Sequence, residues 1–381
     1  MESAEFIKLK KGKVKYKKKL KVKISKKPKF LKRKNNINVK LIIFCTVLIS
    51  ILCLIYLFIS NYSKVFQELT FSFIYKLHKK NKIERFIDES FKAQKDFCDN
   101  PSKYLNQEYE NMIDLTDFEF KNISYQLYIY KKGDNYMSNF IRRTKGYVIK
   151  EMTNFYEVLE YYKETKNILN KKDIYMLDIG GNLGVYPSYF GRLGYTVISI
   201  EASPRNYYLL KKNYCGINKN AENIIIINRG VSNQEKICNY YTQIKGLGNG
   251  MIKCDDNRET FKNDGFIWNK TFEVQIIKLS SLIPYFAKKK LALIKIDIEG
   301  SEALVMQDAI DFIKKYHIPY IYSEFSENML TEHGNNPREY IKLFTDNGYK
   351  VSKEGFLSNN FIEPNKVGPG DLYFTYYGNN N

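Results

Sequence analysis

Two short stretches of the chain combine residue types and spacings that could do chemistry. The first, residues 176–184, reads MLDIGGNLG and leads from an apolar run through Asp178 into three glycines. Glycine has no Cβ, so such a loop brings backbone N–H groups close to a ligand. The next apolar run, residues 196–200, ends in Glu201, where a carboxylate can accept both hydroxyl protons of a ribose.

The spacing of the glycines argues against a dinucleotide. That fingerprint is Gly-x-Gly-x-x-Gly, whereas this loop has Gly180, Gly181 and Gly184 with Asp178 in front. A carboxylate at this position repels a pyrophosphate and attracts an ammonium group. S-adenosylmethionine carries an ammonium group at one end and a ribose at the other. The pattern therefore predicts S-adenosylmethionine as the cofactor.

The second stretch, residues 293–302, reads LIKIDIEGSE. Lys295, Asp297 and Glu299 alternate with isoleucines, so we expect the three charges to share one face of a strand end. Ser301 can cap the helix that follows. An ion-pair cluster that merely satisfies the strand end is the alternative. A reaction site is favoured because this strand is expected beside the first glycine loop.

Together the two stretches resemble the FkbM-type methyltransferase family over residues 145–377. The first block is LDIGGNLG with Glu201 downstream, and the second is similar to the family signature Lys-x-Asp-x-Glu-Gly-x-Glu. Gly181 stands where many relatives carry alanine. The resemblance implies a class I, S-adenosylmethionine-dependent O-methyltransferase with a doubly wound, Rossmann-like α/β sheet of seven strands, mainly parallel with the last strand antiparallel.

The resemblance also implies roles for the motif residues. Asp178 is expected to face the methionine ammonium group, and Glu201 the ribose hydroxyls. Asp297 and Glu299 are candidates for the base that takes the acceptor's proton, because desolvation can raise a carboxyl pKa. His333 is a third candidate, with an ordinary exposed histidine as the alternative. The expected cofactor-binding residues are Asp178, Gly180, Gly181, Asn182, Gly184, Glu201 and Gly230.

Strand and helix patterns alternate through the second half of the chain, which predicts a parallel, doubly wound sheet. Ligands of such sheets lie at the carboxyl ends of the strands, where Asp178, Glu201, Gly230, Asp297 and Glu324 are expected. Glu324 is expected to line the acceptor pocket. Residues 235–277 are less regular, and residues 246–250 (GLGNG) are expected to form a loop.

The basic charge of the chain is concentrated at its N-terminus. The formal net charge is +20, but residues 1–40 hold 17 Lys and Arg against two Glu. The remaining residues carry 44 basic and 39 acidic groups. We interpret the tail as a solvated cytosolic segment beside a membrane, in preference to a nucleic-acid-binding arm, so no nucleic-acid partner is expected.

Residues 41–60 (LIIFCTVLISILCLIYLFIS) carry no charge and are long enough to span a membrane as a helix. Because the basic residues precede this segment, the positive-inside rule places the N-terminus in the cytosol. The expected organisation is a disordered basic tail (1–40), a transmembrane helix (41–60), a stem (61–115) and an FkbM-like domain (116–381, core 145–377). The body is expected to be lumenal, in the Golgi or endoplasmic reticulum, or extracellular.

Four cysteines lie in the body, and an oxidising lumen would permit disulfides, with all three pairings of Cys98, Cys215, Cys238 and Cys254 open. No metal site is expected, because the chain has no Cys-x-x-Cys pair and three histidines. The expected acceptor is a small molecule or a glycan hydroxyl. Two alternatives remain: a metal-dependent glycosyltransferase that uses Asp297 and Glu299, and a non-catalytic binding module.

Overall fold

The computed structural model describes Leu48 and residues 64–146, 149–216, 222–263 and 265–378. The predicted tail (1–40) and, apart from Leu48, the predicted transmembrane helix (41–60) lie outside the described residues. Within the described ranges, no helix is both long and apolar enough to cross a membrane. The chain divides into two compact units, Met1–Phe71 and Ser72–Asn381. The second unit contains all five described hydrophobic clusters and both disulfides. It therefore has its own hydrophobic core, as expected of a domain.

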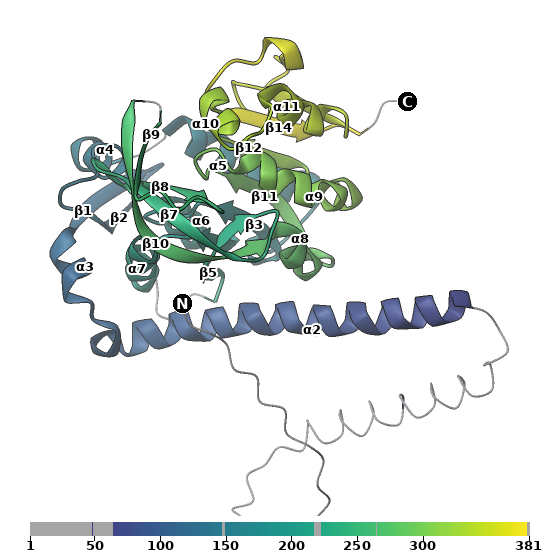
Figure 1. The fold of residues 1–381 in the computed structure, drawn as a ribbon, viewed down its shortest axis with the longest axis horizontal. Coiled ribbons are helices and arrows are strands. Elements are labelled where there is room, and N and C mark those ends of the chain that lie inside the picture. Colours follow the sequence, from purple (N-terminus) through teal and green to yellow (C-terminus); the bar gives the residue numbers. More distant parts are fainter. Residues whose placement is uncertain (1–47, 49–63, 147–148, 217–221, 264, 379–381) are drawn as a thin grey trace, which may run out of the picture. The chain divides into compact units, whose positions relative to one another are not determined.

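A mixed sheet of seven strands forms the centre of the second unit (Figure 1). Its order is β13–β14–β12–β11–β3–β4–β5, and β14 runs antiparallel to both neighbours while the other pairs are parallel. The predicted α/β fold with a mixed sheet is therefore confirmed. The strands are β3 (Ile174–Ile179), β4 (Thr196–Glu201), β5 (Ile224–Asn228), β11 (Lys290–Ile296), β12 (Tyr320–Ser323), β13 (Tyr349–Ser352) and β14 (Leu372–Tyr376).

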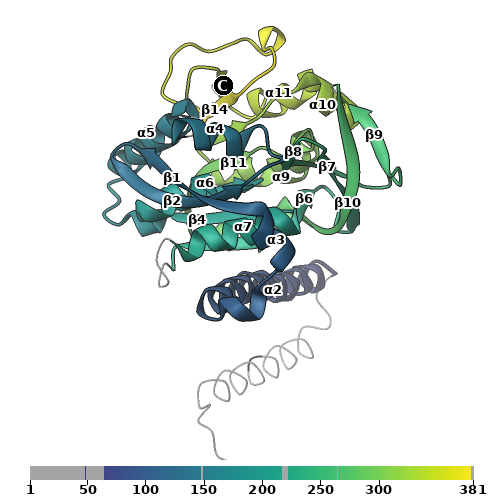
Figure 2. The ribbon, with the colours of Figure 1, turned by 90° about the vertical axis from the view of Figure 1, so that its left-hand side faces the viewer.

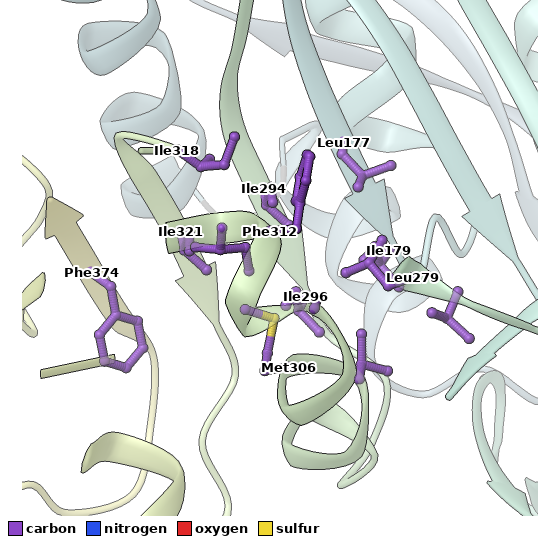
Figure 3. Close-up of a cluster of buried hydrophobic side chains, with 14 of the residues drawn as sticks. Leu177, Ile179, Leu279, Ile294, Ile296, Met306, Phe312, Ile318, Ile321 and Phe374 are labelled. Atoms are coloured by element: carbon purple, nitrogen blue, oxygen red, sulfur yellow. The ribbon is translucent and has the colours of Figure 1, made fainter. Parts of the chain in front are cut away.

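Both faces of this sheet are covered, which explains the nearly continuous apolar strands. Leu177 and Ile179 belong to one hydrophobic cluster, and Met176 belongs to another on the opposite face. Figure 3 shows the first cluster, where the strand side chains lie beside Met306 and Phe312. The covering helices are α5 (Ile149–Thr165), α6 (Val185–Arg192) and α7 (Pro204–Cys215) on one face, and α8 (Leu279–Leu282), α9 (Glu302–Tyr316) and α11 (Pro337–Thr345) on the other.

A second sheet is inserted between β5 and β11, and Figure 2 shows its long β9–β10 hairpin. Residues 246–250 belong to its strand β8, so the predicted loop was wrong. Glycine is needed there for packing, because a Cβ on Gly250 would lie 1.8 Å from the Tyr240 hydroxyl. Cys238 and Cys254 form a disulfide between β7 and β8. The strands are β6 (Gly230–Ser232), β7 (Ile237–Gln243), β8 (Gly246–Lys253), β9 (Thr260–Asn263) and β10 (Phe266–Lys278).

The predicted stem contains helix α2, whose C-terminal end is bonded to the sheet. The Gln94 amide donates to Ile224 O at 2.6 Å and accepts from Ile226 N at 2.8 Å, so it pairs with the open edge of β5. A disulfide joins Cys98 to Cys215 at the end of α7. The N-terminal elements are α2 (Lys64–Asp99), η1 (Pro101–Tyr104), α3 (Gln107–Met112), β1 (Ile113–Phe120), β2 (Ile123–Tyr130) and α4 (Met137–Thr144).

Of the remaining short elements, one directly precedes β3 and three lie in connections between strands of the central sheet. They are η2 (Lys171–Asp173), η3 (Ile283–Phe286), α10 (Glu327–Glu332) and η4 (Pro364–Lys366).

Replacing Gln94 tests whether its hydrogen bonds from α2 to the edge strand β5 stabilise the protein. Gln94→Ala leaves a buried carbonyl and a buried N–H of β5 without partners, so we expect a loss of about 2 kcal/mol in unfolding free energy. Denaturant unfolding measures it. Gln126→Ala, which removes an exposed side-chain hydrogen bond to Asp117, is the control and should change stability by less than about 0.5 kcal/mol. Equal effects of the two changes would contradict the assignment.

Candidate active site

A cleft of about 510 Å³, open to solvent, lies at the carboxyl ends of β3, β4 and β11. Four of the predicted cofactor residues line it: Gly180, Asn182, Glu201 and Gly230. Asp297 and Glu299 line it as well, so the structure brings the two sequence motifs together in one cleft.

Gly180 lies where the loops after β3 and β11 touch. Its φ is 87°, and a Cβ there would lie 1.9 Å from the Asp297 carbonyl oxygen. The amides of Gly180 and Gly181 both donate to Ile200 O, at 2.9 and 3.0 Å. A side chain at Gly180 would therefore force the two strand ends apart and deform the cleft.

Glu201 is a buried carboxylate held by backbone donors. Its Oε2 accepts from Asn182 N at 2.7 Å, and its Oε1 accepts from Ser203 N at 2.8 Å. Burial raises the pKa of Glu201 to about 7, although these hydrogen bonds act in the opposite direction. Each carboxylate oxygen can accept more than one hydrogen bond, so Glu201 can still bind the hydroxyls of a ligand.

Asn182 contributes a second oxygen at the cleft. Its backbone has a φ of 47°, and its side-chain Oδ1 is buried with no hydrogen-bond partner among the described residues. An unpaired buried acceptor is unfavourable, so a ligand that donates a hydrogen bond here would stabilise the site.

Asp178 lies below the glycine loop and does not line the cleft. It is fully buried, and its Oδ2 accepts from Ser199 Oγ at 2.8 Å. Lys295 Nζ lies 3.4 Å from Asp178 Oδ1 and 3.3 Å from Asp297 Oδ2, and it donates to Gly180 O at 3.1 Å. Burial raises the pKa of Asp178, and the charge of Lys295 opposes this shift. Through this hydrogen bond and these two ion pairs, Lys295 links the glycine loop to the end of β11.

Gly181 and Gly184 also lie outside the cleft lining. A Cβ on Gly181 would lie 2.1 Å from Ser199 Oγ, so this position must stay small for the loop to pack. Gly184 begins α6 with a φ of 84° and lies against Leu210. Gly181 and Gly184 are buried, whereas Gly180 is partly exposed.

The acidic stretch is not a continuous strand, so the expected alternation on one face was wrong. Strand β11 ends at Ile296, and Glu299 lies in a turn with a φ of 57°. Ser301 precedes α9 but its side chain makes no capping hydrogen bond. The Glu302 side chain bonds the preceding turn instead, since its Oε1 accepts from Ile298 N at 2.9 Å and from Gly300 N at 3.2 Å. The turn that carries Glu299 is therefore held by a buried carboxylate.

Several carboxyl groups meet at this end of the sheet, and their pKa values are raised. Burial raises the pKa of Glu299 to about 8, with further contributions from Asp297 and Glu302. Glu324 follows β12, and burial together with Glu299 and Asp297 raises its pKa well above the usual value. A cation that enters the cleft would relieve this repulsion, so the site favours a positively charged ligand.

His333 ends α10 and lines a different cavity, on the far side of the Ile298–Ser301 turn. Its imidazole makes a hydrogen bond to the backbone of Glu299. Burial lowers the pKa of His333 to about 4, so the ring is neutral at physiological pH. The structure does not bring His333 into the cleft with Asp297 and Glu299.

Sequence reasoning missed the contribution of the second sheet. Gly248, Asn249 and Gly250 of β8 line the cleft, together with Tyr240 of β7 and Arg229 before β6. The signal was the GLGNG segment, which the sequence led us to interpret as a loop. Within the described residues, no three His, Cys, Asp or Glu side chains lie close enough together to hold a metal ion.

Residues 178–351 match the model of the methyltransferase FkbM domain. The chain therefore carries a methyltransferase FkbM domain over these residues, and this match implies S-adenosylmethionine as the cofactor. No curated protein matches the chain.

Solved structures of methyltransferases are similar to the chain. Precorrin-6y C5,15-methyltransferase from Geobacter metallireducens GS-15 is 14% identical over 58% of this chain and 89% of its own, with a TM-score of 0.28. The bifunctional kinase-methyltransferase WbdD is 11% identical over 59% of this chain and 39% of its own, with a TM-score of 0.33. A TehB-like SAM-dependent methyltransferase from Corynebacterium glutamicum is 11% identical over 59% of this chain and 100% of its own, with a TM-score of 0.28.

The cleft fits S-adenosylmethionine. Glu201 would hold the ribose hydroxyls, and Val231 and Ile252 add apolar surface to the lining that would suit an adenine ring. The orphaned Oδ1 of Asn182 can accept a hydrogen bond from the ligand. The carboxyls of Asp297 and Glu299 suit the positive charge of the sulfonium and ammonium groups.

Removing the cation shared by Asp178 and Asp297 tests the role of Lys295. Lys295→Met leaves a buried carboxylate without its charge partner, so we expect a loss of about 3 kcal/mol or more in unfolding free energy. Lys290→Met on the same strand, where the side chain is exposed, is the control. Denaturant unfolding compares the two. A loss below about 1 kcal/mol for Lys295→Met would show that the buried pair does not hold the loop.

Proposed function

We propose that this protein is a membrane-anchored O-methyltransferase that methylates a hydroxyl group of a glycan or a related acceptor. The observation that carries the proposal is the meeting of Glu201 and Gly180 with Asp297 and Glu299 in one cleft. The first pair suits cofactor binding, and the second pair provides carboxyls beside it. Such an arrangement can bind the cofactor and accept a proton from a hydroxyl group at the same place.

The proposed reaction depends on positioning and on one proton transfer. S-adenosylmethionine, when bound, supplies a methyl group that is transferred to the acceptor oxygen. Asp297 or Glu299 takes the hydroxyl proton as the new carbon–oxygen bond forms. Glu299 suits this role, because it lines the cleft and its carboxyl group becomes ionised when a cationic ligand binds beside it. Glu324, at the end of β12, would line the acceptor side.

Two features support a lumenal or extracellular location for the body. The cysteines of the body form two disulfides, Cys98–Cys215 and Cys238–Cys254, and disulfides persist in oxidising compartments. The uncharged segment 41–60 and the basic tail before it favour a single-pass anchor with a cytosolic N-terminus. A body in this position meets glycans, glycoproteins and glycolipids, which is why a glycan hydroxyl is proposed.

The glycosyltransferase alternative would use Asp297 and Glu299 to hold a metal-bound sugar nucleotide. The match to the FkbM domain, which includes both residues, favours methyl transfer instead. The alternative of a non-catalytic binding module does not explain why a carboxyl group with a raised pKa, Glu299, lines the cleft.

Cofactor binding tests the proposal directly. Isothermal titration of the full chain with S-adenosylmethionine should give saturable binding that Glu201→Ala weakens at least tenfold, or about 1.4 kcal/mol. Glu273→Ala, an exposed glutamate on β10, should leave the affinity unchanged. A folded protein that does not bind S-adenosylmethionine would refute the methyltransferase function, and sugar nucleotides with a divalent metal would then be titrated.

Cofactor affinity should also rise with pH between about pH 6 and pH 7.5. Glu299, with a pKa of about 8, is mostly protonated there, and a cationic ligand favours its ionised form. Binding therefore releases a proton and strengthens as the pH rises, by about threefold or more per pH unit. Titration of Glu299→Gln at the same pH values should show a smaller rise. An identical rise in the variant would exclude Glu299 as the linked group.

A further inference from the structure

A buried asparagine links the central sheet to the second sheet beside the cleft. Asn206 lies in the first turn of α7 and is 1% exposed. Its Nδ2 donates to Gly248 O at 2.9 Å and, at a longer distance of 3.5 Å, to Glu201 Oε1. Its Oδ1 accepts from the Tyr130 hydroxyl at 2.6 Å. One amide group thus joins β2, the end of β4 and β8.

The partners of Asn206 require an amide group in one orientation. Gly248 O and an ionised Glu201 carboxylate can only accept hydrogen bonds, so the NH₂ group must face them. An NH₂ group has two hydrogens and can serve both acceptors. An ionised aspartate has the same shape, but it has no N–H for Gly248 O and adds a second negative charge beside Glu201. The contacts therefore favour asparagine over aspartate at this position.

Asn206 closes a ring of contacts whose other members line the cleft. Asn182 N donates to Glu201 Oε2 at 2.7 Å. Asn182 Oδ1 lies against Gly248, where a Cβ would approach it to 3.2 Å. Glu201, Asn182 and Gly248 all line the cleft, whereas Asn206 lies behind this lining. The ring therefore connects the predicted ribose-binding carboxylate to the second sheet through a side chain outside the cleft.

Strand β8 is irregular where it lines the cleft. The register of its pairing with β7 shifts there, so residues 247–249 lie outside the β7–β8 ladder and form a bulge. Leu247 N donates to Gly133 O at 2.8 Å, and Gly248 O accepts from Asn206. The Asn206 amide therefore bonds a part of β8 that its neighbouring strand does not hold.

We propose that Asn206 is a positioning residue of the cofactor site, which acts through Glu201 and through the β8 bulge at Gly248. The inference rests on the proposed function and deepens it, because it adds a residue on which cofactor affinity depends without a contact to the ligand. Loss of the amide donor leaves the carbonyl of Gly248 unpaired and removes one of the hydrogen bonds that favour the ionised form of Glu201.

The change Asn206→Asp tests the proposal through the pH dependence of cofactor affinity. A protonated aspartate can still donate one hydrogen bond, whereas an ionised one repels Glu201 and leaves Gly248 O without a donor. Isothermal titration of the full chain with S-adenosylmethionine should therefore show a loss of affinity, relative to the parent, that grows between about pH 6 and about pH 8 and reaches about tenfold or more. A loss that is the same at every pH, or no loss, would overturn the proposal.

Asn223→Asp is the matched control. The amide of Asn223 also donates to two backbone carbonyls, Gly191 O and Tyr195 O, each at 2.8 Å. This residue directly precedes β5, at the amino ends of the parallel strands, whereas the cleft lies at their carboxyl ends. The control variant should bind S-adenosylmethionine as the parent does at every pH. A pH-dependent loss of the same size in the control would overturn the assignment to Asn206.

Hydrogen exchange of the free protein, followed by mass spectrometry, tests the same contact without a ligand. At about pH 8, Asn206→Asp should speed the exchange of residues 246–250 relative to the parent, and Asn223→Asp should not. Unchanged exchange in Asn206→Asp would show that the amide does not hold the bulge and would overturn the proposal.

A milder variant covers the case in which Asn206→Asp does not fold. Tyr130→Phe removes only the hydroxyl that bonds Asn206 Oδ1, so it should weaken cofactor binding by about threefold, and unchanged binding would then overturn the proposal. The parent separates this inference from the proposed function. A folded parent that does not bind S-adenosylmethionine would refute the proposed function, whereas parent binding that Asn206→Asp leaves intact would overturn this inference alone.

Discussion

The site depends on one buried electrostatic constraint. Lys295 and Asp178 lie in register on adjacent parallel strands, and Ser199 lies beside Asp178 on the next strand. This polar row crosses an otherwise apolar sheet immediately below the cleft. Buried charges are costly unless they are paired and hydrogen-bonded, so the row is stable only in this strand register. The backbone above it, at Gly180 and Asp297, is positioned as a consequence.

Local patterns made much of the fold predictable. The apolar strands, the glycine loop and Glu201 are each specified by neighbouring residues, so their places could be inferred from the sequence. The contacts of Asp178 could not be inferred from the sequence. Lys295 lies beside Asp178 only because β11 pairs with β3 in the sheet. Glu299 does not lie on the expected strand face, because β11 ends at Ile296 and Glu299 has a positive φ in the turn that follows. The pairing of Cys98 with Cys215 depends on where α2 packs, which no local pattern specifies.

The acidic end of the sheet explains why the cleft suits a cationic cofactor. Glu201, Glu299, Glu302 and Glu324 all have raised pKa values, and burial is the largest cause for each. Ionising all of them would destabilise the folded protein, so the free site holds protons. A ligand with a positive charge can replace those protons. The stability of the site and its selectivity for the ligand therefore have the same electrostatic origin.

The strand order also determines which part of the chain completes the site. Strand β14 (Leu372–Tyr376) lies between β12 and β13, and Asp371, just before it, accepts a hydrogen bond from Tyr322 at 2.7 Å. During synthesis on the ribosome, β12 and the following Glu324 therefore emerge well before the strand that pairs with β12. A nonsense mutation that stops translation just before Leu372 would remove β14, and it would thereby separate β13 from the sheet and leave β12 without one of its two neighbours.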